Sequence, residues 1–244
     1  TDTGLCGSWL FVHDSTGNGS WRTTLDITGW SGLPSLTRTA VGADHHFVGR
    51  GASVQSFTVA PPTNCTTTQG STFCPPEWST AVATDVAGHP VLSPDDSVVY
   101  AAAGTQLVAL RATDGTQLWS GTLGSNATAA PALANGHVYV PTGNGDLAVF
   151  DANGCGTSTC APSWTDRIGS AISTTPAIVS GGVVYVASAD GNLRAYAAAG
   201  CGTATCTSAL KTLATGSTVT GGPVAALGHV YVGTTDGHVL AYGL

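Results

Sequence analysis

The amino-acid sequence predicts an all-β fold assembled from one repeated unit. Near-copies of a single segment begin at Thr128, Ser173 and Thr220, a looser copy begins at Ala87, and the loosest begins near Gly32. A complete copy divides into four short strands, and no copy contains a segment with helical periodicity. Such units, which recur every 41–56 residues measured between the prolines that open them, are typical of the blades of a β-propeller.

Recurring residue types mark the four strands of each copy. A proline opens the first strand, an aromatic residue lies in the second, and a turn containing glycine leads into the third. A tryptophan, or in one case a leucine, opens the fourth. The prolines are Pro34, Pro90, Pro131, Pro176 and Pro223. The aromatic residues are Phe47, Tyr100, Tyr139, Tyr185 and Tyr231, and the fourth strands open at Trp21, Trp78, Trp119, Trp164 and Leu210. One such sheet cannot bury both of its faces alone, so neighbouring blades must pack against one another.

We expect a single β-propeller domain over residues 1–244. Its four-stranded antiparallel blades start near residues 32, 87, 128, 173 and 220. The stretch from Trp9 to Trp21 has the spacing found elsewhere between a third and a fourth strand, whereas the last copy has only the first three strands. We therefore predict that residues 1–31 supply closing strands, and that Ser20–Ile27 pairs with the last blade to close a ring of five.

The spare third strand leaves two alternatives open. WLFVHD, which starts at Trp9, and the C-terminal VLAYGL suit the same place in one blade. Either Thr1–Asp14 packs as an outermost fifth strand with Cys6 buried, or one strand keeps an unpaired edge that pairs with a second chain. In the second case Cys6 can lock the contact as a disulfide, and head-to-tail pairing can propagate into a fibre.

Charged residues are scarce and dispersed. Asp, Glu, Lys and Arg make up 9% of the chain, against about 25% in an average soluble protein. The net charge of −7 comes from isolated aspartates, and the seven Lys and Arg residues form no basic stripe, which argues against nucleic-acid binding. No apolar run approaches the roughly 20 residues of a membrane-spanning helix, so we expect no membrane span.

Six of the seven cysteines form closely spaced pairs, and the segments CGTSTC and CGTATC nearly repeat one another. Local pairs at hairpin tips indicate disulfides, which in turn indicate an oxidising compartment and a secreted protein. The alternative, zinc binding, requires four ligands at suitable spacing, whereas here each pair stands alone. The predicted disulfides are Cys65–Cys74, Cys155–Cys160 and Cys201–Cys206.

Several of these segments resemble a known family. Ala109–Trp119, ALRATDGTQLW, is similar to the A-x-D-x-x-T-G-x-x-x-W signature of propeller repeats of the pyrroloquinoline-quinone (PQQ) type. Gly181–Tyr196 resembles the same family, and the GCGxxTC hairpins resemble its secreted bacterial members. The resemblance covers nearly the whole chain and implies a propeller. Members of the family include quinone-dependent dehydrogenases and also binding or assembly scaffolds without a cofactor.

The dehydrogenase branch of this family fits the chain poorly. By resemblance, those enzymes have eight blades, a Ca²⁺ site, a catalytic carboxylate and often two adjacent cysteines. This chain has no adjacent cysteines, and five blades are too few. We therefore expect no quinone and no other cofactor.

Most histidines and aspartates of the repeat are interpreted as turn residues. A Ca²⁺ site needs several oxygens around one ion, and each Asp-Gly turn offers one carboxylate. The turn aspartates are Asp114, Asp190 and Asp236, and the turn histidines are His137 and His229. Asp44-His45-His46 departs from the repeat, but it has no acid or cysteine partner nearby in the sequence and is interpreted as a surface loop. We predict no metal site.

Residues that depart from the repeat are better candidates for function, because folding already explains the repeated ones. Propeller ligands usually bind the face formed by the inter-blade loops and the turns between second and third strands. On that face we place Trp30, Arg50, Asp85 and His89. Trp30 can stack on a sugar ring while Arg50 and Asp85 hydrogen-bond it, or Trp30 can fill the seam where the ring closes. His89 is either a functional residue at the mouth of the first strand or a residue that packs near the axis.

These observations favour a secreted, non-catalytic propeller that binds a protein partner or a glycan, or serves as a structural unit. The alternative is an extracellular hydrolase or lyase with its site on the same face. Converging carboxylates or a bound metal on that face would favour the enzyme, and a channel lined by small residues would favour the scaffold.

Overall fold

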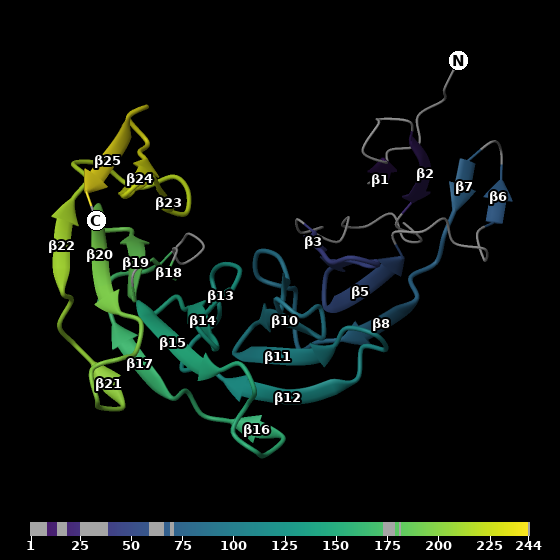
Figure 1. The fold of residues 1–244 in the computed structure, drawn as a ribbon, viewed down its shortest axis with the longest axis horizontal. Coiled ribbons are helices and arrows are strands. Elements are labelled where there is room, and N and C mark those ends of the chain that lie inside the picture. Colours follow the sequence, from purple (N-terminus) through teal and green to yellow (C-terminus); the bar gives the residue numbers. More distant parts are fainter. Residues whose placement is uncertain are drawn as a thin grey trace.

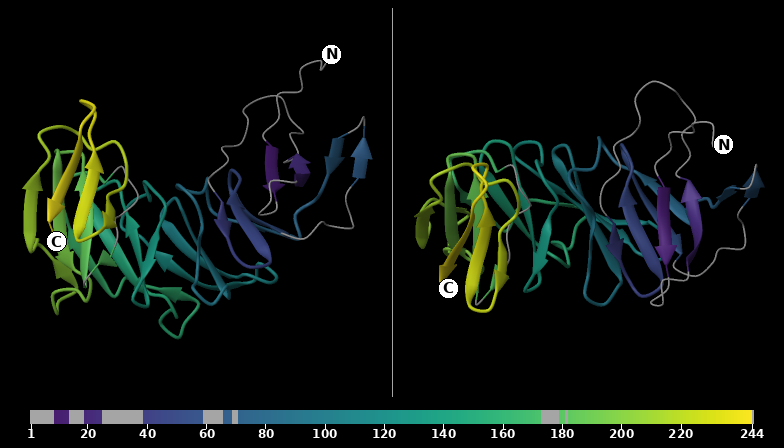
Figure 2. Two further views of the ribbon diagram at one scale, coloured as in Figure 1. Left: turned by 45° about the horizontal axis from the view of Figure 1, so that its top comes forward. Right: turned by 90° about the horizontal axis from the view of Figure 1, so that it is seen from above.

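The structure is a computed structural model that describes residues 9–13, 19–24, 39–58, 66–68, 71–172, 179–180 and 182–243. Every regular element in these ranges is a β-strand. Successive sheets follow one another along an arc, with β1 and β2 at one end and β23–β25 at the other (Figures 1 and 2). No helix in the described ranges is long and apolar enough to cross a membrane.

Five antiparallel sheets follow the repeats, and we call them sheets I to V. Sheet I contains β3 (Ala40–Val41), β4 (His45–Gly49), β5 (Ser53–Thr58) and β8 (Trp78–Ala81). Sheet II contains β9 (Val91–Leu92), β10 (Val98–Ala103), β11 (Gln106–Arg111) and β12 (Gln117–Thr122). Sheet III contains β13 (Ala132–Ala134), β14 (His137–Pro141), β15 (Asp146–Asp151) and β17 (Trp164–Arg167).

The remaining strands form sheets IV and V and two small hairpins. Sheet IV contains β18 (Val179–Ser180), β19 (Val183–Ser188), β20 (Asn192–Ala197) and β22 (Lys211–Ala214). Sheet V contains β23 (Val224–Ala226), β24 (His229–Gly233) and β25 (Val239–Gly243). The hairpins are β1 (Trp9–His13) with β2 (Gly19–Thr24), and β6 (Thr66–Thr68) with β7 (Ser71–Phe73).

The structure confirms most of the strand positions that the recurring residue types predicted. Pro90, Pro131 and Pro223 each directly precede a first strand, and the five aromatic markers all lie in second strands. The glycine turns are also real, as at Gly145, where φ is +82° and a Cβ would lie 2.7 Å from the Ser170 backbone nitrogen.

One marker of the fourth strand is wrong. β22 begins at Lys211, and Lys211 pairs with Ala195 as Trp164 pairs with Val149. Lys211, and not Leu210, therefore occupies the tryptophan position of sheet IV. Leu210 is largely exposed, so the replacement of tryptophan by lysine shifted the apparent pattern by one residue.

The core lies between the sheets, because each strand alternates side chains toward the preceding and the following sheet. Tyr139, Leu147 and Val149 of sheet III are fully buried against Val184 and Val186 of sheet IV. The same positions pack between sheets I and II and between sheets II and III. Packing between sheets is thus the main apolar stabilisation of the fold.

A hydrogen bond recurs where one sheet meets the next. The hydroxyl of Tyr100 donates to the Ala152 carbonyl at 2.8 Å, and that of Tyr139 donates to the Ala198 carbonyl at 2.9 Å. Burial, with nearby carboxylates adding to it, raises the pKa of both tyrosines to about 12. Both hydroxyls therefore remain protonated donors at physiological pH.

The predicted pairing of Ser20–Ile27 with the last blade is not confirmed in the part of this segment that the structure describes. β2 pairs with β1 in the register Val12 to Trp21, and in the described ranges sheet V has three strands, with β25 bonded to β24 alone. Closure and the number of blades are not confirmed.

Candidate functional site

The structure brings two of the predicted site residues to one edge of sheets I and II. Arg50 lies in the turn between β4 and β5, which its backbone closes with Ser53 through hydrogen bonds of 2.8 and 3.1 Å. The next residue, Gly51, accepts a hydrogen bond of 3.0 Å from the backbone of Val86. Asp85 precedes Val86 and is exposed, so Arg50 and Asp85 reach the same edge.

His89 lies further along the same connecting segment. It is half-buried and directly precedes Pro90, which enters sheet II. The adjacent Gly88 fits tightly against sheet III, because a Cβ there would lie 2.2 Å from the Ala130 backbone nitrogen. Trp30 lies outside the described residues, so its stacking on a sugar and its place in the seam stay predictions.

The Asp44-His45-His46 segment differs from its predicted role as a loop. His45 and His46 begin β4, and His45 Nε2 lies 3.0 Å from the Glu77 carboxylate. Burial, and to a smaller extent the neighbouring His45, lowers the pKa of His46. Sequence reasoning missed Glu77 as a partner because it is 32 residues away in the chain. In the described ranges no three His, Cys, Asp or Glu side chains gather as a potential metal site.

The aspartates of the Asp-Gly turns accept hydrogen bonds within their own hairpins, as expected of turn residues. Asp114 accepts hydrogen bonds from Thr116 and Arg111, and Asp236 accepts one from Thr234. Asp190 is bound by Arg194 and Ser188. The hydrogen bond from Arg194 is the main reason that the pKa of Asp190 lies far below its usual range. Each carboxylate is thus used within its own hairpin.

Two of the three predicted disulfides are confirmed. Cys155 bonds Cys160 with a Cα–Cα distance of 5.7 Å, and Cys201 bonds Cys206 with one of 5.8 Å. Cys74 is also disulfide-bonded. Cys65 and Cys6 lie outside the described residues, so the pairing Cys65–Cys74 stays a prediction.

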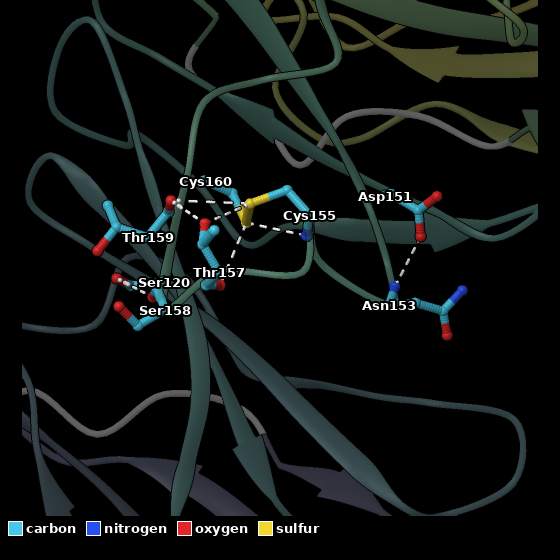
Figure 3. The surroundings of a disulfide bond; sticks show 8 residues. All are labelled: Ser120, Asp151, Asn153, Cys155, Thr157, Ser158, Thr159 and Cys160. Carbon is cyan, nitrogen blue, oxygen red and sulfur yellow. Dashed lines mark hydrogen bonds between the residues drawn. A yellow bond between two sulfur atoms is a disulfide. The ribbon is translucent and has the colours of Figure 1, made fainter.

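The confirmed disulfide hairpins do more than close their own loops. β16 (Thr159–Cys160) pairs in parallel with β12 of sheet II, and β21 (Thr205–Cys206) pairs in parallel with β17 of sheet III. The Ser120 backbone accordingly donates to Ser158 at 2.9 Å (Figure 3). Each hairpin therefore adds a fifth strand to the preceding sheet and covers its outer edge.

A groove of about 820 Å³ lies between sheets II and III beside the Cys155–Cys160 hairpin. Its apolar surface includes Leu118, Trp119 and Leu133, and Leu118 is 39% exposed. Polar groups of Asp95, Asn135 and the hairpin line the rest, and of the lining residues only Asp95 carries a charge. Hydrogen bonds from Ser93 and Ser97 keep the pKa of Asp95 below its usual value. No local sequence pattern predicts this groove, because two different repeats form it.

Comparison with known proteins agrees with this architecture. Residues 68–155 match the family model PQQ_2, described as outer membrane protein assembly factor BamB. The structure is similar to that of BamB from Moraxella catarrhalis, with a TM-score of 0.62, 17% identity and 87% of this chain covered. The repeats are of the PQQ-like type. Search of the curated proteins found no match.

Two designed proteins are also similar to this structure. The computationally designed Ika8 protein superimposes with a TM-score of 0.67 and 16% identity over 86% of this chain, and Ika4 with 0.51 and 18% over 64%. The chain covers 61% of the BamB structure, 58% of Ika8 and 89% of Ika4. The predicted all-β propeller fold and the resemblance to PQQ-like repeats are confirmed.

One residue of the PQQ-like repeat departs from its equivalents inside the core. Asp166 lies in β17 opposite Leu147, the register position that Thr80, Gly121 and Leu213 occupy in sheets I, II and IV. It is 1% exposed. Aligning the fourth strands in the sequence could have revealed an aspartate at this position. The use of Leu210 instead of Lys211 as the marker of sheet IV shifted that alignment by one residue.

Proposed function

We propose that this chain is a non-catalytic scaffold that binds a protein partner through the groove between sheets II and III. The single observation that carries this proposal is the composition of the groove, with an exposed leucine beside buried aromatic and aliphatic side chains and a polar rim. An apolar centre within a polar rim is the usual anatomy of a protein interface. The match of residues 68–155 to the BamB model supports an assembly or binding role.

The wall of the groove is held in place before any partner arrives. The Cys155–Cys160 disulfide and the parallel pairing of β16 with β12 fix Thr157 and Ser158 on the groove surface. A rigid wall lowers the entropy cost of binding. An extended peptide with an apolar side chain for Leu118 and a basic one for Asp95 suits this surface.

The test is selection from a phage-displayed library of random peptides on the folded, oxidised protein. We expect selected peptides to bind the wild type and to lose at least about tenfold in affinity with Leu118→Lys. The matched control is Leu227→Lys, which alters an exposed leucine in the turn between β23 and β24 of sheet V, away from the groove. Equal loss in both variants, or no loss in either, would refute binding at the groove.

Glycan binding and an extracellular hydrolase or lyase stay alternatives at the edge that holds Arg50 and Asp85. A glycan array probed with wild type and Arg50→Ala separates them from the groove. If Arg50→Ala abolishes glycan binding and Leu118→Lys leaves it unchanged, the binding site is the edge that holds Arg50 and Asp85. Secretion is part of the proposal and is supported by the disulfides.

Self-association has one observation in its favour. Val224 and Val239 of sheet V are 55% and 74% exposed, whereas Leu147, which corresponds to Val239 in sheet III, is fully buried by sheet IV. A second copy placed on this face would bury it. Light scattering should then show mass rising with concentration for the wild type and a monomer for Val239→Lys. A wild type that stays monomeric would end this proposal.

A further inference from the structure

A carboxyl group lies in the core between sheets III and IV without the partners that a charged group requires. Asp166 is 1% exposed, and its Oδ2 atom has no hydrogen-bond partner. The indole nitrogen of Trp164, on the same strand, also makes no well-formed hydrogen bond. An ionised carboxylate in such a place pays a large desolvation cost.

Thr80, which occupies the position of Asp166 in sheet I, makes a hydrogen bond to the next repeat. The hydroxyl of Thr80 donates to the Gly115 carbonyl of the following repeat at 2.7 Å. Gly115 packs on the ring of Trp78, where a Cβ would lie 2.5 Å from the indole. Gly200 packs in the same way on the ring of Trp164. A donor at this position can therefore reach the backbone of the next repeat, as Thr80 does, and a carboxyl group donates only when it is protonated.

The groups around Asp166 do not supply a compensating charge. Tyr139 on β14 and Tyr196 on β20 face it, and their pKa values are raised, mainly by burial and partly by Asp166 itself. Cys206 on β21 is disulfide-bonded, and Leu147 lies opposite on β15.

The nearest cation along the strand is already paired elsewhere. Arg167, which follows Asp166, points its guanidinium to Asp146 at 3.2 Å. In the described part of the chain no cation forms an ion pair with Asp166. Burial consequently raises the pKa of Asp166 to about 6, and the Trp164 side chain opposes this only in part.

We propose that Asp166 is a protonated hydrogen-bond donor in the folded protein, and that loss of its proton loosens the contact between sheets III and IV. Because the pKa is higher in the folded than in the unfolded chain, the stabilisation is complete below the unfolded value of about 3.9. It is lost as the pH rises through about 6. The contact between these two sheets is thus a pH-sensitive element of the scaffold.

The test compares urea unfolding of wild type and Asp166→Asn between about pH 4.5 and pH 8. Asparagine keeps the shape and always donates. We expect the folding equilibrium constant of the wild type, relative to the variant, to fall by roughly 25-fold over this range. The control is Asp151→Asn on β15, which alters an exposed aspartate of the same sheet and should not reproduce the effect of Asp166→Asn.

A second measurement keeps the proposal testable if Asp166→Asn fails to fold. The ¹³Cγ resonance of Asp166 in the wild type should titrate near pH 6, which is about two units above an ordinary aspartate. Hydrogen exchange should quicken in β17 and β20 above that pH while β10 and β11 stay protected. A carboxyl that titrates near 4, or a stability ratio that does not change with pH, would overturn the proposal.

Discussion

Removing one hydroxyl at the contact between sheets tests how much the recurring tyrosine bond contributes. In Tyr139→Phe the ring stays in place, but the Ala198 carbonyl loses its donor at 2.9 Å in a fully buried setting. Leaving a buried polar group unsatisfied costs about 1–3 kcal/mol. For a chain of this size a loss of 2 kcal/mol lowers Tm by about 4–8 °C.

The assay is denaturant unfolding followed by tryptophan fluorescence, with Tyr242→Phe as the matched control. Tyr242 donates to the Ala214 carbonyl at the same distance of 2.9 Å, but at an exposed site. Water replaces that donor, so we expect a cost of at most about 0.5 kcal/mol. Equal costs for the two variants would refute the argument that burial between sheets gives the bond its value.

Two further changes probe the same contacts. Replacing both Cys155 and Cys160 by serine should lower the free energy of unfolding by about 2 kcal/mol, the value of the chain-entropy model for so short a loop, measured as a shift in the urea midpoint. The same change should expose the outer edge of β12 to hydrogen exchange. Unchanged protection of β12 would contradict the proposed covering role. Gly121→Ala should lower the free energy of unfolding by about 1–3 kcal/mol, because its Cβ would lie 2.5 Å from the Phe150 ring. Adding Phe150→Leu to the same chain should recover part of this loss. An additive loss in the double variant would contradict this explanation.

The features that local chemistry determines could be read from the sequence. Proline, aromatic and glycine positions placed the strands, since each sets a backbone or packing requirement within a few residues. The pairs Cys155–Cys160 and Cys201–Cys206 were also predictable because their partners are five residues apart. The PQQ-like repeat followed from the same patterns.

The features that join distant residues could not be read in this way. In the described ranges β2 pairs with β1 and not with the last sheet, and pairing between distant strands leaves no local pattern in the sequence. The parallel pairing of β16 with β12 and the contact of His45 with Glu77 arise only once neighbouring repeats are packed. The candidate site was accordingly predicted in part, with Arg50 and Asp85 brought to one edge and the groove missed.

Chemical-shift mapping with a selected peptide tests the binding role most directly. On titration into isotope-labelled protein, we expect the largest amide shifts at the groove, over residues 93–98, 118–119, 133–136 and 153–158. The same peptide should leave the spectrum of Leu118→Lys largely unchanged. Shifts centred on the edge that holds Arg50 and Asp85, with the groove amides unmoved, would contradict the proposed binding surface.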